Sequence, residues 1–318
     1  MSKPVRWLLM VLPFALWGTS MAAMSPLLST SGSLVLAWLR LVPAGILLIL
    51  ILPILGRSWR IAHTDRLWLL LFSLVDASFF QAMLAQGLKD TGAGLGSVLI
   101  DSQPLIVALL ARTLFSEAIN PIGWLGLLLG IFGIFLVGVP TPLLYQWWTQ
   151  GPLTQEVYWS TGEIWMLGAA LSMAIGTVIS RYASRSSDPI AVTGWHMIIG
   201  GLPLVVLHRL GSPDGSFWPQ WSLFEWGLMT YASLLGSALA YGLFFWFTKN
   251  EELTSFTSLT FLTPVFALLC GITILDEHLT SLQWVGVGLA LTSVILVNQR
   301  RSLIQRISWF QPHDLGTS

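Results

Sequence analysis

Charged residues are scarce in this chain of 318 residues, since lysine and arginine total 15, aspartate and glutamate total 15, and together they make up 9%. A soluble domain typically carries roughly 25% charged residues. The net charge of zero also argues against the basic surface that nucleic-acid binding requires. A soluble enzyme, a nucleic-acid-binding protein and a disordered chain are therefore excluded.

Groups that support familiar chemistry are also missing. The single cysteine, Cys270, excludes a disulfide framework and a thiolate metal cluster, and its apolar neighbours predict a packed side chain. The 5 histidines have no partner at metal-ligand spacing. The sequence contains no GxSxG, HExxH or P-loop pattern. We therefore expect no enzyme activity, no metal and no cofactor.

Apolar residues, by contrast, make up 54% of the chain, and the mean hydropathy is +0.74. A helix needs about 20 mostly apolar residues to cross a hydrocarbon core of about 30 Å. The sequence predicts ten such helices, over residues 5–26, 34–55, 66–87, 93–114, 122–139, 163–181, 189–208, 224–247, 254–275 and 282–299. We expect an all-α integral membrane protein that lies mainly in lipid.

The basic residues predict the orientation of these helices, because cytoplasmic loops hold an excess of lysine and arginine. With the N-terminus inside, twelve of the 15 lie on the cytoplasmic side: Lys3, Arg6, Arg57, Arg60, Arg66, Arg112, Arg181, Arg185, Lys249, Arg300, Arg301 and Arg306. Lys89 and Arg209 lie outside, and Arg40 lies within the second helix. Ten helices with both termini cytoplasmic fit this distribution, whereas nine or eleven would put the basic C-terminal segment on the wrong side.

The chain also contains an internal repeat. A shift of 160 residues aligns 97–138 with 257–298 without a gap, and the least common identities are Pro104/Pro264, Glu117/Glu277, Trp124/Trp284 and Gly126/Gly286. The repeats are residues 1–142 and 158–300, with an outer linker at 143–157 and a cytoplasmic tail at 301–318. Because each repeat holds five helices, the second enters from the opposite side. Two inverted repeats of this kind are typical of secondary transporters.

Three charges remain at membrane depth, where each costs about 2.5–3.5 kcal/mol. They are Arg40, Asp76 and Asp101, and the polar residues near them in the predicted helices are Gln81, Gln103, His196 and Tyr241. In one interpretation they line a cavity, where Arg40 meets a substrate carboxylate and an aspartate meets an amine or carries a proton. In the other, Arg40 and an aspartate form a structural ion pair. His196 is either a packing residue or a ligand.

Prolines at corresponding positions, Pro104 and Pro264, predict that the fourth and ninth helices are interrupted. Paired interruptions point to a transport site, although a simple packing kink is the alternative. Glu117 and Glu277 each precede a helix start, so we expect each to cap the helix that follows it. Gly126 and Gly130 form a GxxxG pattern that permits close helix contact.

The stretch FALWGTSMAAM, which contains Trp17, and the matching Pro104–Glu117 and Pro264–Glu277 pairs resemble the EamA-type carriers of the drug/metabolite transporter superfamily. More narrowly, GAGLGSVLIDSQPL and TGWHMIIGGLPL resemble the chloroplast branch of the plant walls-are-thin-related proteins and its cyanobacterial relatives. The resemblance implies a ten-helix carrier whose central cavity is formed by helices 1–4 and 6–9. It adds Trp17 to the expected substrate path.

We therefore expect a secondary transporter that moves a small polar, amino-acid-like metabolite by alternating access, with export as the expected direction. The alternative is a channel or a lipid-handling membrane protein without coupled transport. The expected partners are a small-molecule substrate and the lipid bilayer, with no nucleic acid. A coupling proton and a homodimer stay open, and the short stretch before the first helix favours the plasma membrane.

Overall fold

The computed structural model of the protein describes residues 2–84, 86–87, 99–138, 161–211, 218–275 and 280–309. Within these ranges every regular element is a helix. Nine described stretches are long and apolar enough to cross a membrane, namely Lys3–Met24, Leu34–Ile54, His63–Leu84, Pro121–Gly138, Thr161–Ala183, Pro189–Gly211, Leu223–Asn250, Leu253–Cys270 and Ser281–Arg300. Each coincides with a predicted span, so the all-α membrane class is confirmed.

The remaining predicted span, over residues 93–114, is described only in part. Its C-terminal portion forms α5 (Gln103–Leu114), an apolar helix of 12 residues. Residues 88–98 and the predicted outer linker at 143–157 lie outside the described residues. Ten membrane-spanning helices therefore stay a prediction.

The first half begins with two helices separated by one glycine. Gly32 has a φ of 75°, which glycine adopts without steric cost, and this turn ends α1 before α2 begins. Pro121 begins α6, where a missing N–H removes no intrahelical bond. The elements of this half are α1 (Lys3–Ser31), α2 (Ser33–Ile54), η1 (His63–Asp65), α3 (Arg66–Phe72), η2 (Ser73–Phe79), α5 and α6 (Pro121–Gly138).

The second half contains two composite helices. A π-helical segment joins α10 to α11, and a 3₁₀ segment joins α12 to α13. The elements are α8 (Thr161–Ala183), α9 (Pro189–Gly211), α10 (Leu223–Ser233), η3 (Leu234–Leu239), α11 (Ala240–Asn250), α12 (Leu253–Thr257), η4 (Ser258–Leu262), α13 (Thr263–Leu275) and α14 (Ser281–Trp309).

Irregular segments recur at the repeat interval of 160 residues. The shift moves η2 onto residues 233–239, where η3 forms the same π-helix. It also moves the start of α5 at Gln103 onto the start of α13 at Thr263, and the start of α6 at Pro121 onto the start of α14 at Ser281. The predicted interruptions are confirmed, and each lies immediately before the proline, in the residues that lead into α5 and α13.

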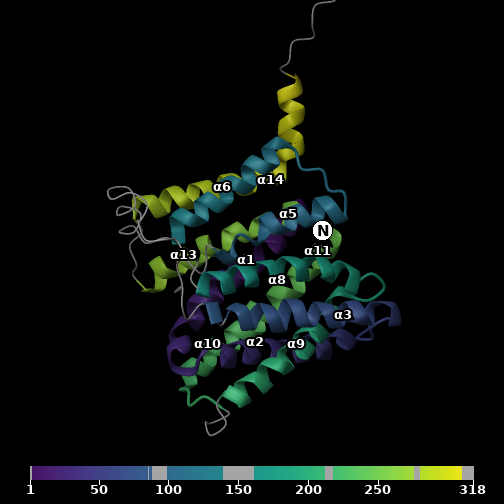
Figure 1. The fold of residues 1–318 in the computed structure, drawn as a ribbon, viewed down its shortest axis with the longest axis vertical. Helices are drawn as coiled ribbons and strands as arrows, with labels where there is room; N and C mark the ends of the chain where they lie inside the picture. The colour runs from purple at the N-terminus through teal and green to yellow at the C-terminus, as the bar shows by residue number, and fades with distance from the viewer. Residues whose placement is uncertain are drawn as a thin grey trace, which may run out of the picture.

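The packing of the helices follows the same repeat. α1 packs on α13 and its equivalent α8 packs on α5, while α2 packs on η3 and its equivalent α9 packs on η2. Two pairs join equivalent helices directly: α2 with α9, and α6 with α14. Figure 1 shows the α6–α14 pair and the α2–α9 pair on opposite sides of the bundle. Each of these contacts between the halves is therefore matched by a contact between the equivalent helices.

Glycines allow α6 and α14 to approach closely. A Cβ on Gly286 would lie 2.6 Å from the carbonyl oxygen of Gly133, and a Cβ on Gly126 would lie 2.8 Å from the Val297 side chain. The expected role of Gly126 in close helix contact is confirmed. Any larger residue at Gly133 or Gly286 would push the two backbones apart.

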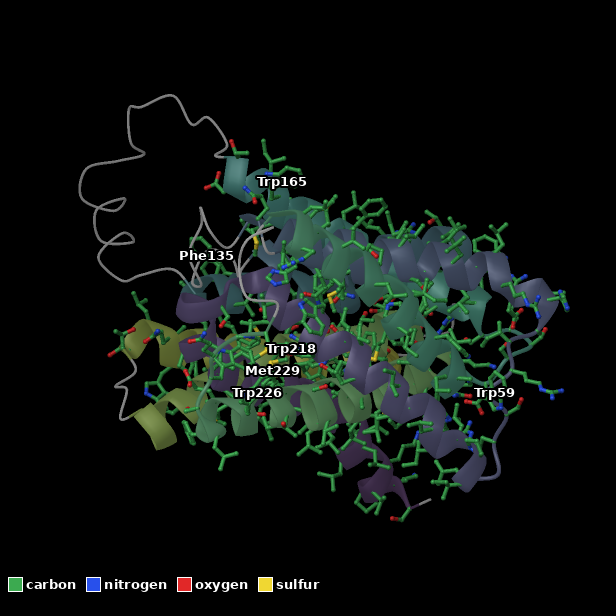
Figure 2. The ribbon with its side chains drawn as sticks, turned by 90° about the horizontal axis from the view of Figure 1, so that it is seen from below. Trp59, Phe135, Trp165, Trp218, Trp226 and Met229 are labelled. Atoms are coloured by element: carbon green, nitrogen blue, oxygen red, sulfur yellow. The ribbon has the colours of Figure 1, made fainter. Side chains whose placement is uncertain are left out.

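Aromatic residues mark both ends of the bundle. Figure 2 shows Trp59 at one end and Phe135, Trp165 and Trp226 toward the other. Tryptophan favours the boundary between lipid and water, where its ring is buried and its N–H stays hydrated. The two ends therefore fit the two surfaces of a bilayer.

Candidate functional site

The buried carboxyl of Asp76 and the imidazole of His196 form the central polar pair. Asp76 lies on η2 and His196 on α9, and Nε2 of His196 is 3.1 Å from Oδ2 of Asp76. The side chains are 3% and 1% exposed. Within the part of the chain that the structure describes, Oδ1 of Asp76 and both ring nitrogens of His196 have no hydrogen-bond partner, so the approach of Nε2 to Oδ2 is a contact at ion-pair distance. We call these two residues the Asp76–His196 pair.

The π-helical turn is what places Asp76 against α8 and α9. Ser172 of α8 donates a hydrogen bond of 2.6 Å to the Val75 carbonyl, and Ser78 donates one of 2.8 Å to the Gly200 carbonyl. A side chain at Gly176 would overlap the Asp76 carboxyl, so α8 approaches the pair with its backbone. π-Helical turns release backbone carbonyls from the regular ladder. Here Ser172 of α8 and Ser78 of η2 itself connect the distorted turn to α8 and α9.

Aromatic rings cover the imidazole. The ring of Phe72 stacks on His196 at a centroid distance of 3.9 Å, and Phe245 meets it edge-on at 5.6 Å. Phe245 in turn stacks on Tyr241 at 5.9 Å. The pair is thus enclosed by apolar surfaces on its α3 and α11 sides.

Arg40 lies near Tyr241 and contacts η3. Its Nε donates a hydrogen bond of 3.0 Å to Ser237 of η3, and its guanidinium carbon is 6.0 Å from the Tyr241 ring centre. Among the described residues no carboxylate lies within ion-pair distance of Arg40, so the predicted alternative of an Arg40–aspartate ion pair is wrong for these residues. The aspartate that is paired, Asp76, uses a histidine instead.

Trp17 completes this second group. Its ring centre is 4.9 Å from that of Tyr241, its side chain is 7% exposed, and its indole N–H has no hydrogen-bond partner within the described residues. Arg40, Trp17 and Tyr241 come from three different helices, α2, α1 and α11. We call these three residues the Arg40 cluster, and it presents hydrogen-bond donors.

The other predicted site residues are also buried. Asp101 is 7% exposed in the turn before α5, and Gln103 donates a 3.2 Å hydrogen bond to Thr177 of α8. Gln81 is 5% exposed. Pro104 and Pro264 are buried in the first turns of α5 and α13.

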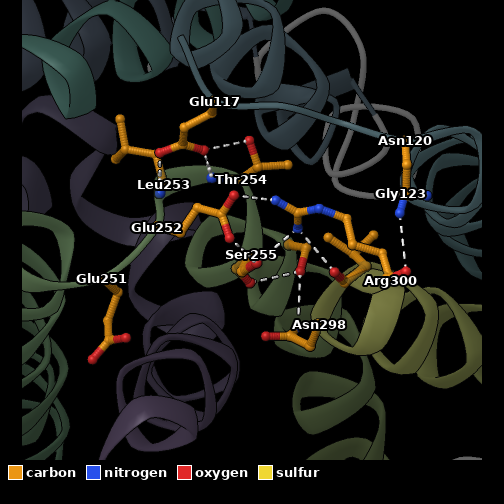
Figure 3. Close-up of polar contacts among 12 residues, drawn as sticks. Glu117, Asn120, Gly123, Glu251, Glu252, Leu253, Thr254, Ser255, Asn298 and Arg300 are labelled. Atoms are coloured by element: carbon orange, nitrogen blue, oxygen red, sulfur yellow. Dashed lines mark hydrogen bonds and ion pairs between the residues drawn. The ribbon is translucent and has the colours of Figure 1, made fainter. Parts of the chain in front are cut away.

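Glu117 does not cap the helix that follows it, so that prediction is wrong. Its carboxylate accepts hydrogen bonds from the backbone N–H groups of Leu253, at 2.8 Å, and Thr254, at 3.1 Å, and from the Thr254 hydroxyl, at 2.9 Å. Figure 3 shows it above the first residues of α12. Asn120 caps α6 instead, accepting from the Gly123 N–H at 2.9 Å. The prediction for Glu277 lies outside the described residues.

Further ion pairs and hydrogen bonds surround Glu117 at this end of the bundle. Arg300 of α14 pairs with Glu252 and donates to Ser255 at 2.7 Å (Figure 3). Arg181 of α8 lies 3.9 Å from Glu117 and donates to the Thr248 carbonyl at 2.8 Å.

These contacts continue to the first helix and to the loop before α9. Arg6 of α1 pairs with Glu251, and Lys249 donates to the Ser187 carbonyl at 3.2 Å. Contacts between charged and polar groups therefore connect both halves at one end of the bundle. We call the group formed by Arg6, Glu117, Arg181, Glu251, Glu252 and Arg300 the inner network.

Sequence reasoning missed the partners in both places. His196 and Asp76 are 120 positions apart, and Glu117 and Leu253 are 136 apart. The only available signal for the first contact was that both polar groups lie at membrane depth. For the second there was none, because a cap on a distant helix leaves no local pattern.

Comparison with known proteins agrees with this architecture. The sequence profile of the EamA-like transporter family matches residues 6–139 and 160–299. One relative is a Synechocystis sp. protein named Uncharacterized transporter sll0355, 49% identical over 302 residues, which cover 93% of this chain and 90% of that protein. Another is the Arabidopsis thaliana WAT1-related protein At3g02690, chloroplastic, 44% identical over 297 residues, which cover 92% of this chain and 69% of the relative.

A solved crystal structure shares the fold, with a TM-score of 0.77 over 96% of this chain and 99% of that chain, at 17% identity. The two matched ranges of the family profile correspond to the two predicted repeats, and the Synechocystis relative is named as a transporter. With its apolar helices, this chain is a multi-pass membrane protein that functions in transport. The chain belongs to the EamA-like transporter family.

Proposed function

We propose that the protein is a secondary carrier that exports a small polar metabolite by alternating access. It is built from two inverted repeats of five helices, residues 1–142 and 158–300. The observation that carries the proposal is the exchange of helix contacts between the halves, in which α1–α13 matches α8–α5 and α2–η3 matches α9–η2. Inverted halves that exchange conformations convert an inward-open carrier into an outward-open one.

The distribution of basic side chains supports an orientation with both termini in the cytoplasm. Arg6, Arg57, Arg181, Lys249 and Arg300 all make their polar contacts at one end of the bundle. An excess of lysine and arginine is typical of the cytoplasmic side. The inner network then closes the cytoplasmic end, and the membrane we propose is the plasma membrane.

The Arg40 cluster is the proposed contact for an anionic group of the substrate. A guanidinium presents five donors in a planar arrangement that suits a carboxylate. Arg40 uses Nε on Ser237, and the Trp17 indole N–H adds a buried donor beside Tyr241. A carboxylate would balance both the charge and the donors, in agreement with an amino-acid-like metabolite.

The test begins with an untargeted comparison of metabolites inside and outside cells that have or lack the protein. The compound retained in cells without it is then offered to proteoliposomes. Transport by the unmodified protein should saturate with substrate concentration. Arg40→Gln should lower transport at limiting substrate by about 10- to 100-fold, because losing a hydrogen bond to a charged group costs about 1.5–3 kcal/mol.

The matched control is Arg60→Gln, which removes an exposed arginine beyond the end of α2 and should leave transport unchanged. Conductance without saturation would identify a channel and contradict the proposal. Equal losses in both variants would contradict the role of Arg40.

A further inference from the structure

The Asp76–His196 pair has the features of a site for a proton rather than for a metabolite. Its two side chains are 3% and 1% exposed, and Phe72 stacks on the imidazole at 3.9 Å. The backbone of Gly176 leaves no room for another group beside the carboxyl. A substrate group would have to displace these contacts, whereas a proton needs no additional space.

The charge of the pair depends on one proton. With one proton in addition to the imidazole's own N–H, the pair is neutral overall; Oδ2 of Asp76 and Nε2 of His196 are 3.1 Å apart. Without that proton it carries one negative charge in a low-dielectric interior, where an uncompensated charge is costly. The free Oδ1 of Asp76 and Nδ1 of His196 have no partner within the described chain that would stabilise either charged form. Taking up or releasing the proton must therefore alter the packing around it.

The groups that face the pair are few. From α9 the facing titratable group is His196 itself, and α8 contributes Gly176 and the Ser172 hydroxyl, which is bonded to the Val75 carbonyl. From α3 the neighbour is Phe72, and from α11 it is Tyr241, which interacts electrostatically with Asp76. Arg40 of α2 lies near Tyr241. No second carboxylate of the described residues lies within ion-pair distance of His196.

The repeat places the pair at a special position. The 160-residue shift moves Asp76 of η2 onto Gly236 of η3, so only the first π-helical segment carries a carboxyl. In the second half, Gly236 packs against Ser20 of α1 at the place where Asp76 packs against Gly176 of α8. A single proton site at one of two equivalent π-helical segments would bias one half relative to the other.

We propose that the Asp76–His196 pair is a proton-binding site that takes up and releases one proton as the carrier changes conformation. The proton comes from water that reaches the pair in one conformation and is released to water in the other, and no covalent bond other than O–H or N–H changes. The inference rests on the proposed alternating access and names the coupling ion. It divides the polar groups into a proton site and the separate Arg40 cluster.

Proton binding is tested first, without any transported compound. The full-length protein is reconstituted in phosphatidylcholine vesicles and titrated with acid and base while infrared difference spectra are recorded. A carboxyl C=O component of the difference spectrum should titrate in the unmodified protein. Asp76→Asn should lose the carboxyl band, whereas Asp101→Asn, which removes another buried carboxyl, should keep it.

A second variant, His196→Gln, tests the proton site even if the Asp76→Asn protein does not fold. In His196→Gln the carboxyl band should remain and its midpoint should move by about one pH unit or more, the usual effect of a neighbouring charge. A set of titrating carboxyl bands that is unchanged in Asp76→Asn, or a midpoint that does not move in His196→Gln, would overturn the proton site. Neither result would affect the proposed carrier function.

The link to conformation is tested with a membrane-impermeant maleimide as the probe. In a Cys270→Ser background, a cysteine is introduced by Thr257→Cys in α12, where the native side chain is 0% exposed. At each pH, the labelling rate of this cysteine protein is divided by the rate of the same protein that also carries Asp76→Asn. This ratio should change at least threefold between acidic and alkaline buffer. A ratio independent of pH would overturn the coupling even if the infrared titration succeeds.

Discussion

Neutralising Glu117 should open the end of the bundle that we propose to be cytoplasmic. In Glu117→Gln the side chain keeps its shape but loses its charge, and its new NH₂ group faces donors. The carboxylate accepts three hydrogen bonds, from two backbone N–H groups and one hydroxyl, at 2.8, 3.1 and 2.9 Å. Its side chain is 9% exposed, and Arg181 lies 3.9 Å away.

The magnitude follows from the bonds that the amide cannot make. One amide oxygen cannot replace two carboxylate oxygens, so at least one bond to a charged group is lost, at about 1.5–3 kcal/mol. Because these contacts join the two halves, the loss falls on the inward-closed conformation of the proposed carrier. At about 1.4 kcal/mol for each factor of ten, its population relative to the inward-open one should fall by about 10- to 100-fold.

The assay is maleimide labelling of Thr257→Cys in the Cys270→Ser background, with the reagent on the cytoplasmic side. The labelling rate should rise about 10- to 100-fold in Glu117→Gln. The matched control is Glu225→Gln, because Glu225 also accepts a backbone N–H at a helix start, from Ser222 at 2.7 Å, but at the opposite end of the protein. A rate that is unchanged in Glu117→Gln, or raised equally by both variants, would refute the role of Glu117 as a contact that closes the inner end.

Two further substitutions test the packing and the helix ends. Gly286→Ala should destabilise the protein by about 1–3 kcal/mol and lower its thermal midpoint, because the new Cβ would lie 2.6 Å from the Gly133 carbonyl oxygen. The control Gly288→Ala should leave the midpoint unchanged, because its Cβ would have no atom within 4 Å. Asp188→Ala should cost about 1 kcal/mol of unfolding free energy, because it removes the acceptor for the Ile190 N–H at 2.8 Å. Equal midpoints for the two glycine variants, or an unchanged midpoint for Asp188→Ala, contradict these assignments.

The fold was accessible from the sequence because lipid imposes a simple rule on length and polarity. Nine predicted spans coincide with apolar helices of the structure, and the residues aligned by the 160-residue shift begin equivalent helices at Gln103 and Thr263. The π-helical segments were not predicted, since the sequences SLVDASF and LLGSAL contain no proline that would interrupt a helix. Their geometry is set by tertiary bonds such as Ser172 to Val75, which a local pattern does not contain.

The residues of the candidate site were predicted from the sequence, but which of them contact one another was not. Arg40, Asp76 and His196 were identified because polar groups are costly in lipid. Which of them meet depends on the rotation of helices about their axes, and neither length nor hydropathy determines that angle. For this reason Asp76 was expected beside a cation or a ligand, and it lies beside His196. Glu117 was assigned to the nearest helix start, whereas the structure places it on a helix of the other half.

The two π-helical segments also affect how this chain tolerates changes in length. A π-turn accommodates one residue more than the regular ladder, so the residues before and after it point in directions that a continuous α-helix would not give. Deleting one residue within η2 or η3 would remove the wide turn and restore a regular α-helix, so the residues beyond it would keep nearly their present directions. Deleting one residue from the regular helix that follows would instead rotate everything beyond the deletion by about 100°. The two π-helical segments are therefore the places where these helices can lose a residue without turning their other side chains away from their present neighbours.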